Sequence, residues 1–326
     1  MGLPTKIFFN SFIFGFIFYP YFIKFLKKIS KGGQPIRSCG PESHLITKRN
    51  TPTIGGIIIL ISTSLPVLLW TQLTPETLLL VFMIFFFALI GFIDDYLKLK
   101  AYTHQGLRAK TKIFIQFIVV LVIMFIFKPY LAEGSTKTFL FREITIDFGY
   151  LYVPFATFVI VGSANAVNLT DGLDGLAATQ SITSFVSLGL IAHITQASMS
   201  IILFCIAFIG AILSFLWFNT HPAKIFMGDV GSLSIGAALG LISVLIKREV
   251  LFAIIGAIFV METLSVIIQI SYFKYTKFKY GKGKRIFLMT PIHHHFEKNG
   301  WLENEIVVKF WIIAITCSTF TVAFLL

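Results

Sequence analysis

Ten long apolar runs, separated by polar connections, follow one another along the 326 residues of this chain. About twenty residues of α-helix cross the roughly 30 Å of hydrocarbon in a bilayer, and a helix satisfies its own backbone hydrogen bonds there. The predicted spans cover about residues 5–26, 54–73, 76–96, 111–129, 151–167, 175–194, 198–217, 231–247, 250–273 and 306–326. The sequence therefore predicts an all-α polytopic membrane protein of about ten transmembrane helices, forming a single domain over residues 1–326.

The composition excludes an ordinary soluble domain. The chain is 56% hydrophobic and only 13% charged, and it contains 37 Phe residues. Its net charge of +12 would also suit a nucleic-acid partner, but the basic residues lie between apolar runs and not on a soluble face. We therefore expect no nucleic acid, and we assign the charge to orientation in the membrane.

The basic residues are divided unequally between the two sides of the predicted spans. All but six of the 27 Lys and Arg residues lie in the connections that follow odd-numbered spans, or in their flanks. The six others are Lys6, Lys128, Lys137, Arg142, Lys247 and Arg248. Because cytoplasmic loops of membrane proteins are enriched in Lys and Arg, this predicts cytoplasmic odd-numbered connections and two periplasmic termini.

One periplasmic connection, about residues 129–150, is long enough to hold structure of its own. It contains Thr138-Phe-Leu-Phe and Glu143-Ile-Thr-Ile-Asp-Phe-Gly, two short segments rich in β-formers. They predict a small β-hairpin lying on the membrane.

A polar segment, Asn168-Leu-Thr-Asp171-Gly-Leu-Asp174-Gly175, lies between two apolar runs. If it is helical, Asp171 and Asp174 share one face, which could hold a cation or a hydroxyl-rich substrate. Helix capping alone accounts for such residues at a helix start. However, five of the six Asp residues lie at span ends on the predicted cytoplasmic side, and Asp147 is the exception. Capping gives no reason for that one-sidedness, and acids at membrane boundaries are usually functional.

Asp94 and Asp95 close the third predicted span, where capping does not explain them, because acids oppose the dipole at a helix C-terminus. A metal, a cationic partner or a proton is the better explanation. Asp229 lies between glycines at the start of the eighth span, where it could cap the helix or face Mg²⁺.

Two further cytoplasmic segments have residues suited to phosphate. Lys48 to Gly56 joins basic residues, hydroxyls and a glycine pair at a helix start, whose free amides could bind a phosphate. Positive-inside charge with a helix cap explains the same segment, and both interpretations stay open. The segment His293-His294-His295 is unlike a zinc site, since consecutive residues do not share a helix face. Hydrogen bonding of one or two of them to phosphate or sugar is the better interpretation. Glu262, inside the ninth span, is kept as a helix-break or structural residue.

Five segments together resemble one family, that of the phospho-N-acetylmuramoyl-pentapeptide transferases, within the polyprenyl-phosphate N-acetylhexosamine-1-phosphate transferases. They are Thr51-Pro-Thr-Ile-Gly-Gly, Asp94-Asp95, Asn165-Ala-Val-Asn-Leu-Thr-Asp-Gly-Leu-Asp-Gly-Leu-Ala, Phe226-Met-Gly-Asp-Val-Gly-Ser and Pro291-Ile-His-His-His-Phe-Glu. They occur in the family's order over nearly the whole chain. One departure is Ile54, where the family more often has Met.

The resemblance implies a multi-pass enzyme of the bacterial cytoplasmic membrane with its active site facing the cytoplasm, and a homodimer. It would transfer phospho-MurNAc-pentapeptide from UDP-MurNAc-pentapeptide to undecaprenyl phosphate in the lipid membrane, using Mg²⁺ and forming lipid I and UMP. The resemblance implies catalytic roles for Asp94, Asp95, Asp229 and His293, with Asp229 as the metal ligand. It implies substrate binding by Lys48, Thr53, Lys110, Asn168, Asp171, Asp174, Asn219 and His294.

Two rival functions remain open. A sibling transferase acting on UDP-GlcNAc would share the Asp-Asp and Asn-Leu-x-Asp-Gly elements, but the His293 to Glu297 segment favours the muramoyl branch. A secondary transporter would also carry intramembrane acids and Gly-broken helices, near the midplane of two repeated halves. Here the acids lie at span ends, and no internal repeat is visible.

Overall fold

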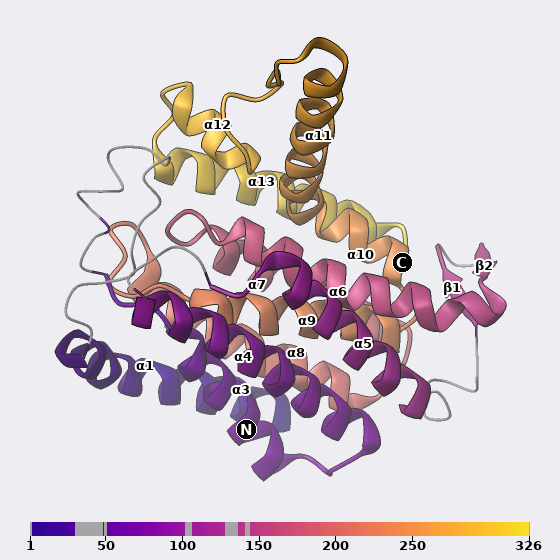
Figure 1. Ribbon diagram of the computed structural model, residues 1–326. Coiled ribbons are helices and arrows are strands. Elements are labelled where there is room, and N and C mark those ends of the chain that lie inside the picture. Colours follow the sequence, from indigo (N-terminus) through magenta and orange to yellow (C-terminus); the bar gives the residue numbers. More distant parts are fainter. Residues whose placement is uncertain are drawn as a thin grey trace.

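The computed structural model describes residues 2–29, 48, 51–101, 106–127, 136–140 and 144–325. Figure 1 shows a bundle in which most helices lie side by side. The helices are α1 Leu3–Ile29, α3 Gly56–Trp70, α4 Pro75–Ala101, α5 Ala109–Phe127, α6 Tyr152–Thr170, α7 Leu176–Ile194, α8 Met199–Asn219, α9 Gly228–Leu245, α10 Glu249–Ile255, α11 Ala257–Tyr280, α12 Ile292–Lys298 and α13 Glu303–Ala323.

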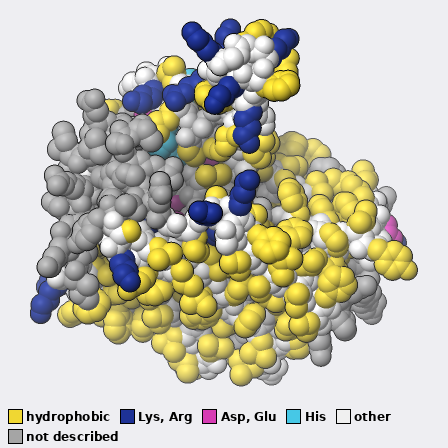
Figure 2. All heavy atoms as spheres, viewed as in Figure 1, with side chains coloured by type: hydrophobic (Ala, Val, Ile, Leu, Met, Phe, Trp, Pro, Cys, Tyr) yellow, Lys and Arg dark blue, Asp and Glu magenta, His cyan; other side chains and the backbone are white. Residues whose placement is uncertain are grey.

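The all-α membrane architecture predicted from the sequence is confirmed. Within the described ranges, nine helices are long and apolar enough to cross a membrane, and α3 is a shorter apolar helix. These ten correspond in order to the ten predicted spans. Figure 2 shows a broad apolar surface over the face of the bundle that is in view, as expected for helices that face lipid.

Helix α9 is the centre of the bundle, and nearly all of its residues are buried. It packs against α6 on one side and α4 on another. Small residues make these contacts close: a side chain at Gly236 would lie 2.5 Å from the Ser163 carbonyl oxygen of α6. Close backbone approach of this kind is how membrane helices gain packing energy without a hydrophobic driving force between them.

The ninth predicted span is broken, whereas one continuous helix over 250–273 was expected. Helix α10 ends at Ile255, and α11 begins at Ala257. Gly256 between them has φ −87° and ψ 26°, outside helical geometry, and this interrupts the helix. Figure 1 shows α11 leaving the bundle across the direction of the other helices. The break is thus at Gly256, and Glu262 lies inside α11.

The predicted hairpin is confirmed as a two-stranded antiparallel sheet, in which β1 (Lys137–Phe139) pairs with β2 (Thr145–Asp147). Residues 141–143 of the connection lie outside the described residues. A 3-10 turn, η3 (Gly149–Leu151), then leads into α6. The sheet is tied to the bundle where Phe139 N–H donates to the Lys247 carbonyl oxygen at 3.0 Å.

Candidate active site

Three carboxylates meet at the opposite end of α9 from the hairpin. Asp94 and Asp95 come from α4, and Asp229 comes from the first turn of α9. Each offers an oxygen within 4.8 Å of the others. Gly91, one turn before the pair, permits this meeting, because a side chain there would lie 2.3 Å from the Asp229 carbonyl oxygen. Helix α4 continues to Ala101, so the Asp pair lies inside the helix. The predicted span boundary at 96 had placed the pair at the helix end.

Two lysines balance part of the charge of this aspartate cluster of Asp94, Asp95 and Asp229. The Lys98 ammonium lies 2.6 Å from Asp94 Oδ2 and 3.3 Å from Asp229 Oδ1. Lys112 Nζ lies 2.8 Å from Asp229 Oδ2 and 3.9 Å from Asp94 Oδ2. Like charges this close would repel strongly without such partners. The arrangement places two cations directly against the three carboxylates.

The predicted basic residue of this region, Lys110, is not brought to the aspartates. Its side chain is exposed, and among the described residues it makes no hydrogen bond or ion pair. Lys112, half a helical turn further along α5, faces the cluster instead. Residues two positions apart point to different sides of a helix, so only one of the two can face the cluster. Sequence spacing alone did not reveal which of the two lysines faces the cluster.

Backbone and amide donors fix the orientation of the carboxylates. Leu107 N–H donates to Asp94 Oδ1 at 2.7 Å, and Val230 N–H donates to Asp95 Oδ2 at 3.3 Å. Asn168 Nδ2 donates to Asp229 Oδ1 at 2.9 Å, so this predicted residue does lie in the cluster. Asp229 caps no helix; it faces the other two acids.

The predicted residue Thr53 lies beside Asp95. Its hydroxyl is buried and has no hydrogen-bond partner within the described part of the chain. A side chain at Gly228 would lie 2.8 Å from Thr53 Oγ1 and 2.6 Å from Asp95 Oδ2, so the two polar groups flank Gly228. A buried hydroxyl without a partner is costly, which is the pattern expected where a ligand completes the bonding.

The aspartate cluster fits a hard divalent cation. All three residues offer carboxylate oxygens, the ligands that such ions prefer. Asp95 Oδ1 is buried and accepts no hydrogen bond among the described residues, and the Lys98 ammonium lies 3.8 Å from it. This oxygen, orphaned of hydrogen bonds, is the feature that a divalent cation would satisfy in the set of three acids.

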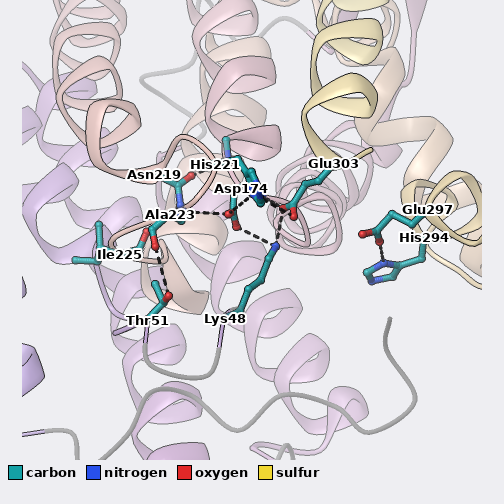
Figure 3. Close-up of polar contacts among 11 residues, drawn as sticks. Lys48, Thr51, Asp174, Asn219, His221, Ala223, Ile225, His294, Glu297 and Glu303 are labelled. Atoms are coloured by element: carbon teal, nitrogen blue, oxygen red, sulfur yellow. Dashed lines mark hydrogen bonds and ion pairs between the residues drawn. The ribbon is translucent and has the colours of Figure 1, made fainter. Parts of the chain in front are cut away.

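A second polar cluster, Lys48, Asp174, His221 and Glu303, lies beside the first and is drawn in Figure 3. Lys48 Nζ bridges two acids: it lies 2.9 Å from Asp174 Oδ1 and 2.5 Å from Glu303 Oε1. His221 Nδ1 lies 3.1 Å from Asp174 Oδ2. Four segments far apart in the chain thus meet here, and Asp174, His221 and Glu303 form a second set that could bind a metal.

Charge pairing governs protonation in this second cluster. Burial raises the pKa of Asp174, but the Lys48 charge and the hydrogen bonds from Lys48, Ala223 N–H and His221 outweigh it, so the pKa lies below its usual range. Burial lowers the pKa of Lys48, but Glu303 and Asp174 raise it further than burial lowers it. Both effects favour the ionised pair at neutral pH.

The segment after α6 is not helical, so Asp171 and Asp174 do not share a helix face. Asp171 is the residue after the last turn of α6, and α7 begins only at Leu176 after Gly175, whose φ is +82°. Burial, and then the nearby charges of Asp229 and Asp95, raise the pKa of Asp171 well above its usual value. The two acids therefore have opposite protonation tendencies.

Asn219 holds this segment in place. Its Oδ1 accepts from Gly175 N–H at 2.9 Å, and its Nδ2 donates to the Ile225 carbonyl oxygen at 2.8 Å. Both ends of the side-chain amide are therefore used to join the loops that follow α6 and α8. The geometry gives Asn219 a role in shaping the site.

The first amides of α3 are not free for a phosphate. Gly55 N–H donates to the Phe226 carbonyl oxygen and Gly56 N–H to that of Met227, both at 2.9 Å. The predicted glycine pair therefore docks α3 against the loop before α9, and of this segment the Lys48 and Thr53 side chains face the two clusters. Arg49 and Asn50 lie outside the described residues.

The three histidines begin α12 and have different surroundings. His293 is fully buried beside Glu262 of α11, with Nδ1 3.1 Å from Glu262 Oε1. His294 Nδ1 lies 2.6 Å from Glu297 Oε2. The His295 ring packs edge-on against Phe287. As expected from their spacing, the three do not converge on one metal.

Comparison with known proteins decides the family. The family model of glycosyl transferase family 4 matches residues 77–247. The phospho-N-acetylmuramoyl-pentapeptide-transferase of Wolbachia pipientis wMel is 78% identical over 326 residues, covering the whole of both chains. The chain belongs to this transferase family. A namesake from Rickettsia felis is 46% identical over 318 residues, which cover 92% of this chain and 86% of the relative.

Family membership confirms the resemblance drawn from the motifs, and it makes this protein a membrane-embedded transferase. Sequence reasoning did not assign Lys98, Lys112, His221 or Glu303 to the site. Only Lys98 had a local signal, since it lies four residues after Asp94 on one helix face. The other three reach the site through tertiary packing.

Proposed function

We propose that this protein transfers phospho-MurNAc-pentapeptide from UDP-MurNAc-pentapeptide to undecaprenyl phosphate, giving lipid I and UMP. The observation that carries the proposal is the aspartate cluster with Lys98 and Lys112 at one end of an apolar bundle. Such a site suits a soluble anionic donor and an acceptor anchored in the bilayer. The names of the 78% and 46% identical relatives support the same reaction.

We propose Mg²⁺ as the cofactor, with Asp229 as its ligand and Asp94 and Asp95 beside it. The support is the set of hard oxygen donors and the orphaned Asp95 Oδ1. When bound there, Mg²⁺ would stabilise the charge that develops on the pyrophosphate and the leaving UMP. Lys98 and Lys112 balance part of the carboxylate charge. Their ammonium groups are also suited to bind phosphate oxygens of the donor.

In the proposed mechanism an oxygen of undecaprenyl phosphate attacks the β-phosphorus of the donor directly. A new P–O bond forms, the bond from that phosphorus to the bridging oxygen of UMP breaks, and UMP leaves with the electron pair. Asp94 would help to remove a proton from the acceptor phosphate. Leu107 N–H and Lys98 each contact one Asp94 oxygen and hold this carboxylate in place. We favour direct attack because a phosphate monoester anion is already nucleophilic and needs no covalent relay.

The alternative is a two-step route through a phosphorylated aspartate. Incubation with labelled donor in the absence of lipid acceptor separates the routes. A trapped acyl phosphate would overturn direct attack; its absence, together with turnover once acceptor is added, supports it.

We assign substrate binding to the residues around both clusters. Lys48 and Asp174, with Asp171, Thr53 and Asn168, surround the place for the nucleotide and its phosphates, and Asn219 shapes the loops there. His293 and His294 would serve the sugar phosphate. For Lys110 only the resemblance implies a substrate contact; its exposed position, and the contact of Lys112 with Asp229, favour Lys112 for the phosphate role instead.

We propose that both clusters face the cytoplasm and that the hairpin is periplasmic. The distribution of Lys and Arg supports this orientation. Figure 2 shows Lys and Arg gathered at the free end of α11, where Lys274, Lys277 and Lys279 are exposed. We also propose a single domain over residues 1–326 and a homodimer, which family resemblance supports; the mass of the purified protein in detergent tests the dimer.

The deciding experiment measures UMP release from UDP-MurNAc-pentapeptide and undecaprenyl phosphate, with and without Mg²⁺, by wild type and Asp229→Ala. We expect Mg²⁺-dependent release that Asp229→Ala abolishes. Turnover of UDP-GlcNAc instead would assign the protein to the sibling branch, and inertness toward both donors would contradict the proposed function.

A further inference from the structure

Glu262 is a carboxylate buried within a predicted membrane span, and its neighbour is a histidine of the site. Both Glu262 and His293 are fully buried. Glu262 Oε1 lies 3.1 Å from His293 Nδ1, and the His293 backbone N–H donates to Glu262 Oε2 at 3.4 Å. One carboxylate thus contacts both the ring and the backbone of His293, joining the broken span to α12.

A buried acid needs a partner at this depth, because an isolated carboxylate in low dielectric is costly. Among the described residues, His293 is the group that faces both carboxylate oxygens. A carboxylate beside an imidazole restricts where the ring can lie. The 3.1 Å contact does not have the geometry of a hydrogen bond between Glu262 Oε1 and His293 Nδ1, so Glu262 holds His293 through this close contact and through the backbone N–H. His293 Nε2 lies on the opposite edge of the ring.

The opposite edge of the ring is directed at the site. A side chain built at Gly172 would lie 2.3 Å from His293 Nε2, so the imidazole packs directly against the segment between Asp171 and Asp174. Both ring nitrogens of His293 are buried and have no hydrogen-bond partner within the described residues. The His293 ring also contacts the His294 ring, with 4.1 Å between their centroids. His293 thus contacts two parts of the site.

We propose that Glu262 is a positioning residue for the transferase reaction: it holds the His293 ring in place, and His293 in turn supports the Asp171 to Asp174 segment and His294. The inference rests on the proposed function, since it assumes that His293 serves the site. The break in the ninth predicted span lies at Gly256, so breaking the helix does not account for Glu262. Positioning of His293 gives this buried acid a role.

A double-mutant cycle with Glu262→Gln and His293→Gln tests the proposal. If Glu262 acts through His293, each single variant lowers kcat about tenfold to a hundredfold with little change in KM for the donor. The double variant is then no worse than His293→Gln alone. Losses that multiply in the double variant would overturn the proposal, because Glu262 would then act independently of His293.

Glu249→Gln is the matched control. Glu249 is also a buried acid at the start of an intramembrane helix, but it contacts Thr138 and Tyr152 at the hairpin end of α9. We expect Glu249→Gln to lower the thermal unfolding midpoint while leaving kcat near wild type, and its effects to multiply with those of His293→Gln. If Glu249→Gln and His293→Gln proved as strongly coupled as Glu262→Gln and His293→Gln, the effect of Glu262→Gln would be general destabilisation. That result would overturn the proposal.

The same double-mutant cycle can be measured on the thermal unfolding midpoints of the variants, and this measurement needs no substrate. Non-additive midpoints for Glu262 and His293 support the contact even if the wild type proves inert toward UDP-MurNAc-pentapeptide, in which case the proposed function alone has failed. Additive midpoints, in a wild type that does release UMP, would contradict the positioning role.

Discussion

Lys112 Nζ lies 2.8 Å from Asp229 Oδ2, whereas Lys110, two residues earlier on α5, is exposed. Lys112→Gln removes a cation from the aspartate cluster and should lower kcat/KM for UMP release by about 10²-fold, the usual effect of deleting one electrostatic contact in an active site. Lys110→Gln is the matched control and should change it by less than about threefold. Equal losses in the two variants would contradict the assignment of Lys112.

Gly172→Ala should impair activity because its side chain would meet the His293 ring, 2.3 Å from Nε2. We expect kcat to fall about tenfold or more and the unfolding midpoint to drop by a few degrees. Gly162→Ala is the control, since a side chain at Gly162 on the preceding helix meets nothing within 4 Å. Normal kinetics of Gly172→Ala would show that the imidazole is free to move away.

The Lys48 to Asp174 pair should give the protein a stability that depends on pH. The folded state lowers the pKa of Asp174 below its usual value of 3.8, so the stabilisation is complete above that value. It is lost as pH falls through the lower, folded-state pKa. Asp174→Asn should therefore cost roughly 2 kcal/mol at pH 7, and the difference from wild type should shrink below pH 4.

The unfolding midpoints of wild type and Asp174→Asn, measured from pH 3 to pH 8, check this prediction. Glu305→Gln is the control, because the pair of Glu305 with Lys309 is exposed and should hardly affect stability at any pH. A difference between Asp174→Asn and wild type that stays constant down to pH 3 would contradict the prediction.

Ile54 has φ +74°, in the left-handed region that β-branched residues rarely adopt, next to Thr53 of the site. Ile54→Met removes the branch at Cβ while keeping the buried volume. We expect it to stabilise the protein by about 1 kcal/mol, which is a rise of about 2–4 °C in unfolding midpoint. Ile58→Met, at a buried helical position of α3, should give no such gain. A lower midpoint for Ile54→Met than for Ile58→Met would show that packing outweighs strain.

The sequence by itself determined the membrane architecture, the order of the spans and the identity of most acids in the site. Hydrophobic run length translates directly into spanning helices, because a bilayer leaves backbone polar groups no other partners. The five aspartates at the ends of these runs were recognisable since buried charge is rarely tolerated without a use. The hairpin was equally predictable, from two short segments rich in β-formers.

Only the tertiary structure decided which side chains meet. Lys112 and not Lys110 faces Asp229 because of the rotation of α5, and Glu303 reaches Lys48 across 255 residues of chain. The break at Gly256 and the pairing of Glu262 with His293 likewise depend on how α11 and α12 pack. A local sequence pattern gives the period and face of one element, whereas contacts between elements depend on helix rotation and close approach, which the whole packed bundle sets.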